Sequence, residues 1–174
     1  MKNNDKKFVA IITGPGYEDA EVIVPYYRFL EEGFLVDVIT SNDSEVKGKH
    51  GYVIAPTKKI KDLKVADYEV VIVPGGYEAP DRVRQVPELV LFVKQMFNAG
   101  KLVSTNCHGP WVLIEAGIVK GKKVTCYKGM KTDLINAGAN YVEKDVVVDG
   151  NLISSDHPRS IGPWMKATIE ALRA

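Results

Sequence analysis

The segment N-C-H-G-P at residues 106–110 places a thiol beside an imidazole. A strand over 102–105 is predicted to run directly into a helix that begins at Pro110, because proline suits the first position of a helix. A strand-to-helix turn without a loop is sharp and strained, so its central residue projects above the sheet as in a nucleophile elbow. The helix N-terminus would favour the thiolate of Cys107, and the adjacent amides would bind an oxyanion. We therefore predict that Cys107 is a nucleophile.

Each of these residues also has a simpler interpretation. Most free cysteines are small buried core residues, which is the alternative for Cys107 and our assignment for Cys126 in the strand-like run KKVTCY. His108 is either a base for the thiol or an exposed turn histidine, because neighbours on a sharp turn can point apart. The two cysteines form neither a CxxC pair nor a disulfide framework. No metal site is expected, because no histidine or cysteine pair has metal-ligand spacing.

Short β-branched runs alternate along the chain with longer amphipathic segments. Strands are predicted at 8–13, 34–40, 69–76 and 102–105. Helices are predicted at 19–32, 87–100, 110–116, 131–137 and 160–172. Hairpins are predicted at 45–54 and 146–155. This alternation is typical of an α/β fold, with a mostly parallel sheet and helices on both faces.

Ligands of such folds bind beyond the carboxyl ends of the strands, so three strand ends matter, at 13–19, 74–81 and 105–109. The first contains Glu18 and Asp19 at the start of a helix, where acidic residues are also favoured by the helix dipole. Asp19 is predicted to cap that helix. The second contains Asp81, which next to Arg82 has the alternative of an exposed surface pair.

Composition and charge narrow the classes of protein. The 174 residues predict one domain over 1–174, with a core that folds without disulfides or a structural metal. The formal charge of +1 gives no basic excess, so neither nucleic acid nor a membrane surface is expected as a partner. The apolar run at 8–12 is too short for a signal peptide, and polar residues interrupt the run at 102–114. We expect a cytoplasmic protein with reduced thiols.

Four motifs stand in order along the chain: G-Y-E-D-A-E at 16–21, P-G-G-Y and A-P-D-R within 74–82, N-C-H-G-P-W at 106–111 and V-V-V-D-G-N-L-I-S-S at 146–155. Together they resemble the PfpI/ThiJ family, the intracellular-protease-like branch of the DJ-one superfamily, which is related to class I glutamine amidotransferases. The resemblance extends from about Phe8 to Leu172. It implies a flavodoxin-like α/β sandwich, with helices on both faces of the sheet and the cysteine at the elbow. It also implies homodimers, or hexamers assembled from them.

The resemblance assigns roles to four residues of the expected catalytic group. Cys107 and His108 match the nucleophile and the histidine that follows it. Glu18 matches an acidic residue whose carboxyl approaches the sulfur, and would tune it by donating a hydrogen bond. Asp81 matches an acidic position, more often Glu, that in some members reaches the histidine of a neighbouring subunit. The carboxylate of Asp81 is shorter than that Glu, which is a departure from the family's pattern.

The resemblance also implies a pocket around the thiol. Gly75 and Gly76 match a turn whose amides stabilise an oxyanion, and Tyr127 matches a tyrosine near the pocket. His157 lies in D-H-P, where many relatives have Arg-x-Pro, and Asn106 stands where relatives often have an apolar residue. These departures indicate an altered substrate pocket.

Three functions fit these residues. The leading hypothesis is a cysteine-dependent enzyme that needs no added cofactor and acts on small reactive carbonyls in the manner of a glyoxalase or deglycase. In it, Cys107 attacks an aldehyde while Glu18 or His108 moves the proton. The second is a peptidase that uses Cys107, His108 and Asp81 across subunits. The third is a non-catalytic, redox-responsive or holdase-like stress protein in which Cys107 is oxidised.

A nicotinamide dehydrogenase is the general alternative for an α/β chain, because Gly14-Pro15-Gly16 follows the first strand. The glycine fingerprint is incomplete, however, since Asp19 occupies its sixth position. Glu18 and Asp19 would also place negative charge where a pyrophosphate should bind. We therefore set this alternative aside.

Overall fold

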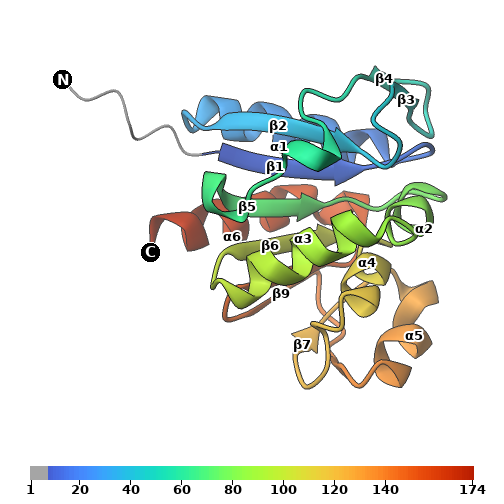
Figure 1. Ribbon diagram of the computed structural model, residues 1–174. Coiled ribbons are helices and arrows are strands. Elements are labelled where there is room, and N and C mark those ends of the chain that lie inside the picture. The colour runs from blue at the N-terminus through green and yellow to red at the C-terminus, as the bar shows by residue number, and fades with distance from the viewer. Residues whose placement is uncertain (1–7) are drawn as a thin grey trace.

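Six strands form the central sheet of the computed structural model, which describes residues 8–174 (Figure 1). Their order across the sheet is β2-β1-β5-β6-β10-β9. All pairs are parallel except β9 with β10, which is the hairpin predicted around Asp149-Gly150. The bounds are β1 Phe8–Thr13, β2 Leu35–Thr40, β5 Tyr68–Val73, β6 Leu102–Asn106, β9 Val146–Asp149 and β10 Leu152–Ser155.

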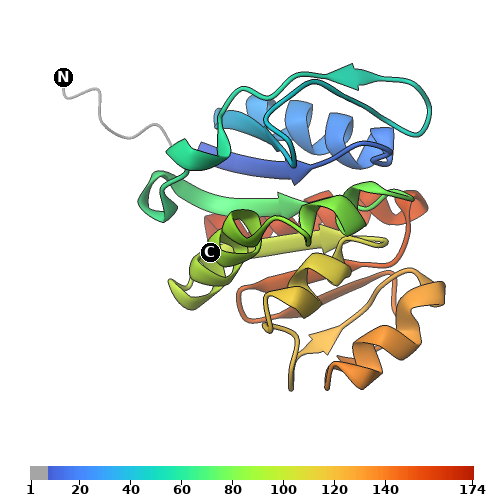
Figure 2. The same ribbon diagram turned by 45° about the vertical axis from the view of Figure 1, so that its right-hand side comes forward.

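Helices cover both faces of this sheet (Figures 1 and 2). In β1, Val9 and Ile11 point into one core and Ala10 and Ile12 into the other. A strand buried on both faces is apolar at nearly every position, which explains the run FVAII before Thr13. The first core packs against α1 (Asp19–Glu31) and α6 (Ile161–Arg173), and the second against α3 (Pro87–Asn98) and α4 (Pro110–Glu115).

Shorter elements complete the described chain. The predicted excursion at 45–54 is an antiparallel hairpin, and two further short strands form a parallel pair beside β9. The helix α2 (Ala79–Val83) has only five residues and was not predicted, because so short a segment shows no periodicity. The remaining bounds are β3 Val46–Lys47, β4 Val53–Ile54, β7 Lys123–Val124, α5 Lys131–Asn136, β8 Asn140–Tyr141, η1 Ile60–Asp62, η2 Val65–Asp67, η3 Lys128–Met130 and η4 Pro158–Ser160.

The start of α1 differs from the prediction. Asp19 does not cap the helix: the N-cap position is Glu18, whose side chain makes no capping hydrogen bond. Asp19 instead accepts hydrogen bonds from the amides of His50 at 2.8 Å and Tyr52 at 2.9 Å. These amides lie in the turn of the β3-β4 hairpin, and one carboxylate satisfies both. Asp19 therefore fixes this turn, and Lys49 within it, beside the start of α1.

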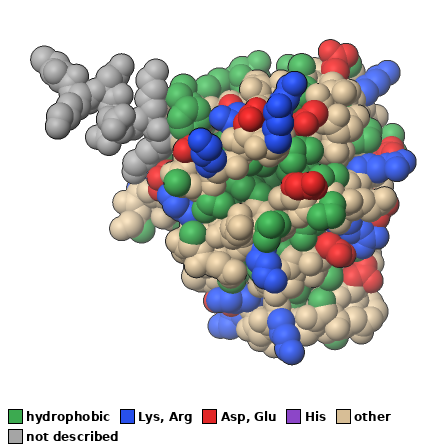
Figure 3. All heavy atoms as spheres, in the orientation of Figure 1, with side chains coloured by type: hydrophobic (Ala, Val, Ile, Leu, Met, Phe, Trp, Pro, Cys, Tyr) green, Lys and Arg blue, Asp and Glu red, His purple; other side chains and the backbone are tan. Residues whose placement is uncertain are grey.

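The surface carries charge of both signs. On the face shown in Figure 3, lysine and arginine side chains are interspersed with aspartate and glutamate. Within residues 8–174, none of the helices has the length and apolar character needed to cross a membrane.

Candidate active site

The turn between β6 and α4 has the geometry of a nucleophile elbow. Cys107 adopts φ 56°, a left-handed conformation that costs a residue with a side chain about 1–2 kcal/mol. The surrounding backbone holds it there: the Cys107 amide donates to the Ser155 carbonyl at 3.0 Å, and the Gly109 amide donates to the Asn106 carbonyl at 2.8 Å. The predicted strained turn is thus present in the structure.

Gly109 lets this turn lie directly against the neighbouring strand. A Cβ atom at this position would come within 2.2 Å of the Val73 carbonyl oxygen and 2.3 Å of Thr105 Oγ1. Those two atoms are already joined by a hydrogen bond of 2.8 Å. The backbone of the elbow can therefore approach β5 only because residue 109 has no side chain.

The thiol of Cys107 faces a cavity of about 410 Å³ at the carboxyl end of the sheet. Only 7% of Cys107 is exposed to solvent. Six of the predicted site residues line the cavity, whereas Gly75 and Asp81 do not. The lining consists of Glu18, Lys49, Gly76, Tyr77, Cys107, His108, Tyr127, His157 and Pro158.

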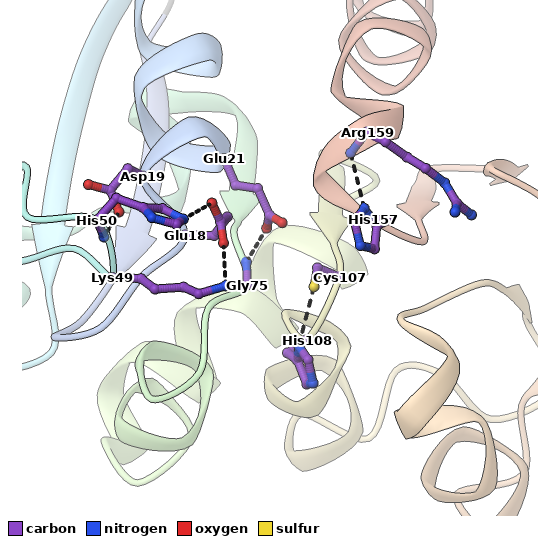
Figure 4. Close-up of polar contacts among 10 residues, drawn as sticks. All are labelled: Glu18, Asp19, Glu21, Lys49, His50, Gly75, Cys107, His108, His157 and Arg159. Carbon is purple, nitrogen blue, oxygen red and sulfur yellow. Dashed lines mark hydrogen bonds and ion pairs between the residues drawn. The ribbon is translucent and has the colours of Figure 1, made fainter.

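His108 is oriented toward the sulfur. Its Nδ1 lies 3.2 Å from Cys107 Sγ (Figure 4). The ring stacks on Tyr127 with centroids 4.8 Å apart and lies 5.2 Å from Trp111. Burial lowers the pKa of His108, and the charge of Lys49 lowers it further. His108 is therefore a neutral base at physiological pH, positioned to take the thiol proton.

The carboxyl nearest the sulfur belongs to Glu21, which the sequence analysis missed. Its side chain is fully buried, and its Oε2 accepts a hydrogen bond of 2.6 Å from the Gly75 amide (Figure 4). Burial raises its pKa to about 8, an effect only partly offset by the Gly75 amide and by contact with the Cys107 thiol. Glu21 is therefore largely a neutral acid at pH 7, able to donate a proton toward the site.

Glu18, to which that role was assigned, is engaged elsewhere. Its Oε2 lies 3.2 Å from Lys49 Nζ, and its Oε1 lies 3.2 Å from His50 Nε2 (Figure 4). Glu18 precedes α1, whereas Glu21 lies within its first turn, where the helix faces the sulfur. The motif E-D-A-E contains both carboxylates, and the second of them, not the first, lies beside the sulfur.

The resting state of Cys107 also differs from the expectation. Burial raises the pKa of the thiol, and the nearby Glu21 raises it further, while the His108 amide only partly opposes them. The helix α4 has just six residues, so its N-terminus does not outweigh these effects. Burial therefore favours the protonated thiol, which is the opposite of the expected effect of the helix N-terminus. The thiol requires a base when it reacts, and His108 is the adjacent one.

The two glycines predicted to stabilise an oxyanion are not equivalent. The Gly75 amide is already used by Glu21, so it is not free to bind an oxyanion. The Gly76 amide makes no hydrogen bond to another described residue, and Gly76 lines the cavity. Its φ of 126° suits glycine alone, and a Cβ there would lie 2.4 Å from the Gly16 carbonyl oxygen.

Asp81 lies on α2 and pairs with Arg84 at 2.6 Å, while Arg82 pairs with Glu78. Asp81 thus forms an ion pair with an arginine, as the simpler alternative predicted, but its partner is Arg84 and not Arg82. Within residues 8–174, Asp81 makes no hydrogen bond to His108. Its action across subunits stays a prediction.

The buried Glu21 should make stability depend on pH. The unfolded chain loses the proton near the ordinary pKa of 4.5, whereas the folded protein keeps it up to about 8. The folded state therefore loses stability as pH rises between these values, by up to roughly 5 kcal/mol. Glu21→Gln has no group that titrates at this position, so its free energy of unfolding lacks this loss. Relative to the wild type, the free energy of unfolding of the variant should therefore rise by a few kcal/mol when the pH is raised from 5 to 8. Urea unfolding at both pH values measures this difference, and an unchanged difference would contradict the burial argument.

Comparisons with known proteins agree with this geometry. The family model described as "DJ-1/PfpI family" matches residues 7–171. "Deglycase PfpI" from Pyrococcus furiosus is 38% identical over 165 residues, which are 95% of this chain and 99% of the relative. "Deglycase PH1704" from Pyrococcus horikoshii is 39% identical with the same coverage.

Solved structures confirm the predicted fold. Drosophila melanogaster DJ-1beta superposes with a TM-score of 0.89 at 29% identity, covering 96% of this chain and 90% of that one. A two-domain Anabaena variabilis protein with DJ-1/ThiJ/PfpI-like and ferritin-like domains superposes with a TM-score of 0.93 at 37% identity. That match covers 96% of this chain but 48% of the two-domain chain.

Proposed function

Because the chain belongs to the DJ-1/PfpI family, we propose that it is a cysteine-dependent enzyme acting on small reactive carbonyls, of the glyoxalase or deglycase type. The observation that carries this proposal is the 3.2 Å pair of Cys107 Sγ and His108 Nδ1, which opens into a cavity beside the buried acid Glu21. The deglycase names of the relatives in Pyrococcus support the same class of reaction.

The first chemical step forms a bond between Cys107 Sγ and the aldehyde carbon. As the sulfur attacks, His108 Nδ1 takes the thiol proton, so no free thiolate needs to accumulate. The carbonyl electron pair moves onto oxygen, where the Gly76 amide can stabilise the charge. Protonation of this oxygen gives a neutral hemithioacetal.

The second step converts this adduct to product without an external oxidant. For a 2-oxoaldehyde, a base removes the hydrogen from the former aldehyde carbon, and a proton returns to the neighbouring carbon. The result is a 2-hydroxy thioester, which water hydrolyses to a 2-hydroxy acid and the free thiol. Glu21 and His108 are the groups beside the sulfur that can exchange these protons.

Glu21 also sets the alkaline limit of the reaction. Above its pKa of about 8 it becomes a carboxylate beside the sulfur and opposes negative charge there. The acid limit comes from His108, whose lowered pKa keeps it a base to below the ordinary histidine range. A plateau through neutral pH is therefore expected for kcat/KM.

The proposal is tested by product analysis with the purified protein. Methylglyoxal is supplied alone, and lactate is measured with no metal or cofactor added. In parallel, a preformed methylglyoxal adduct of N-acetylarginine, freed of unbound aldehyde, is followed for release of the amine. A fluorogenic peptide serves as the third substrate.

Enzyme-dependent lactate, or amine release faster than spontaneous decay of the adduct, supports the proposal. Lactate and amine at buffer rates would contradict it. Enzyme-dependent cleavage of the peptide alone would favour the peptidase, in which Asp81 would act across subunits.

A further inference from the structure

We propose that His157 is a substrate-contacting residue, whose Nε2–H donates a hydrogen bond to a second oxygen adjacent to the reacting carbonyl. This inference rests on the proposed function and assigns the residue that would recognise the oxygen on the carbon next to the reacting carbonyl. It concerns a residue of the cavity wall that takes no part in the proton transfers described above.

The tautomer of His157 is set by the backbone. The Arg159 amide donates a hydrogen bond to His157 Nδ1 at 3.2 Å and so caps the turn η4 (Figure 4). Because Nδ1 accepts this bond, the proton of the neutral ring lies on Nε2. Nε2 makes no hydrogen bond within residues 8–174, and His157 lines the cavity. Its Nε2–H group is therefore available as a hydrogen-bond donor to a molecule in the cavity.

The ring is also held at a fixed place relative to the sulfur. It lies 5.9 Å from the ring of Tyr127, which itself stacks on His108. The Tyr127 amide donates to the Cys107 carbonyl at 3.0 Å, and Asn106 Nδ2 donates to the His157 carbonyl at 3.4 Å. These two hydrogen bonds connect the segments that carry Tyr127 and His157 to the elbow.

The charged side chains on the side of the cavity opposite His157 are paired with each other. Glu18 and Lys49 lie on one side of Cys107 in Figure 4, paired with each other, and His157 lies on the other. The first substrate oxygen is accounted for by the Gly76 amide near the elbow. An N–H donor on the far wall suits a second oxygen of the substrate, such as that of a ketone or hydroxyl group.

Two substitutions separate the two nitrogens of the ring. In His157→Asn the amide oxygen stands near the place of Nδ1, so it can still cap the turn but cannot reach the cavity. In His157→Gln the amide nitrogen stands near the place of Nε2, so the donor is kept and the cap is lost. A role in the turn alone would make Gln the worse variant, and a role in substrate contact would make Asn the worse one.

The experiment measures kcat and KM for methylglyoxal, together with Tm, for the wild type and both variants. For His157→Asn we expect kcat/KM to fall about 10-fold or more, mainly through KM, with an unchanged Tm. For His157→Gln we expect kcat/KM within about 3-fold of the wild type, with a lower Tm.

The outcomes separate this inference from the proposed function. An active wild type with His157→Asn equally active overturns the inference and leaves the proposed function standing. Loss in His157→Gln with retention in His157→Asn also overturns it, because the cap would then be what matters. A wild type that turns over neither methylglyoxal nor its N-acetylarginine adduct overturns the proposed function and, with it, the inference that rests on it.

Discussion

Replacing Cys107 with alanine should lower kcat/KM for methylglyoxal at least about 1000-fold, because the substitution removes the atom that bonds to the substrate. Alanine keeps the same backbone preferences, so the left-handed turn at φ 56° and its bond to Ser155 should persist. The measurement is the rate of lactate formation by Cys107→Ala and the wild type over methylglyoxal concentrations below the wild-type KM, with circular dichroism to verify the fold.

Cys126 provides the matched control. It is buried to 1% exposure among apolar side chains and does not line the cavity. Cys126→Ala should therefore keep kcat/KM within about 3-fold of the wild type, since it removes a thiol outside the cavity. If Cys107→Ala turns methylglyoxal over like the wild type, the nucleophile is wrongly assigned. If both variants lose activity together, packing is the cause and not the thiol.

Gly109→Ala should destabilise the protein by about 3 kcal/mol, the upper end of the usual cost of overpacking, and abolish turnover. The added methyl would have to occupy space 2.2 Å from a carbonyl oxygen of β5, where no flexible side chain can move aside. Either the elbow shifts away from the sheet or β5 separates from it, and both displace Cys107 from His108. Chemical denaturation and the lactate assay measure the two effects.

Gly162→Ala controls for the general effect of adding a methyl group to a glycine. Gly162 lies in α6 with no atom within 4 Å of the new Cβ and no positive φ. Because Gly162 is the second residue of α6, alanine there should change the stability by less than about 1 kcal/mol. A stable and active Gly109→Ala would show that the elbow has more room than its contacts imply.

The fold was largely predictable because its strongest signals are local. The run FVAIIT is β1 to the residue, and Gly33 with φ 82° stands just beyond α1, where a glycine ends a helix. The Asp149-Gly150 turn joins β9 to β10 as predicted. The five-residue α2 and the 3-10 turns were not predicted, since they are too short for a periodic pattern.

The site was predictable only in part because its chemistry depends on how deeply each side chain is buried in the folded protein. Cys107 and His108 are adjacent in the chain, and their turn is encoded locally, so both were found. Which of Glu18 and Glu21 faces the sulfur depends on how α1 docks on the sheet, which spacing alone does not reveal. The pKa of the thiol is raised because several segments of the chain bury it. The Gly75 amide is occupied because it donates a hydrogen bond to Glu21, which lies 54 positions earlier in the chain.

The cavity is lined by segments from Glu18 to Pro158, and the Cys107 amide is held by Ser155 on a late strand. A polypeptide emerging from the ribosome therefore presents its sulfur well before it can enclose it. During that interval the thiol lacks both the oriented imidazole of His108 and the proposed donor at His157, so nothing around it distinguishes a substrate from other reactive molecules. Selective reactivity is gained only when β10 and the turn at His157 have joined the sheet, because these late segments hold the elbow and close the cavity.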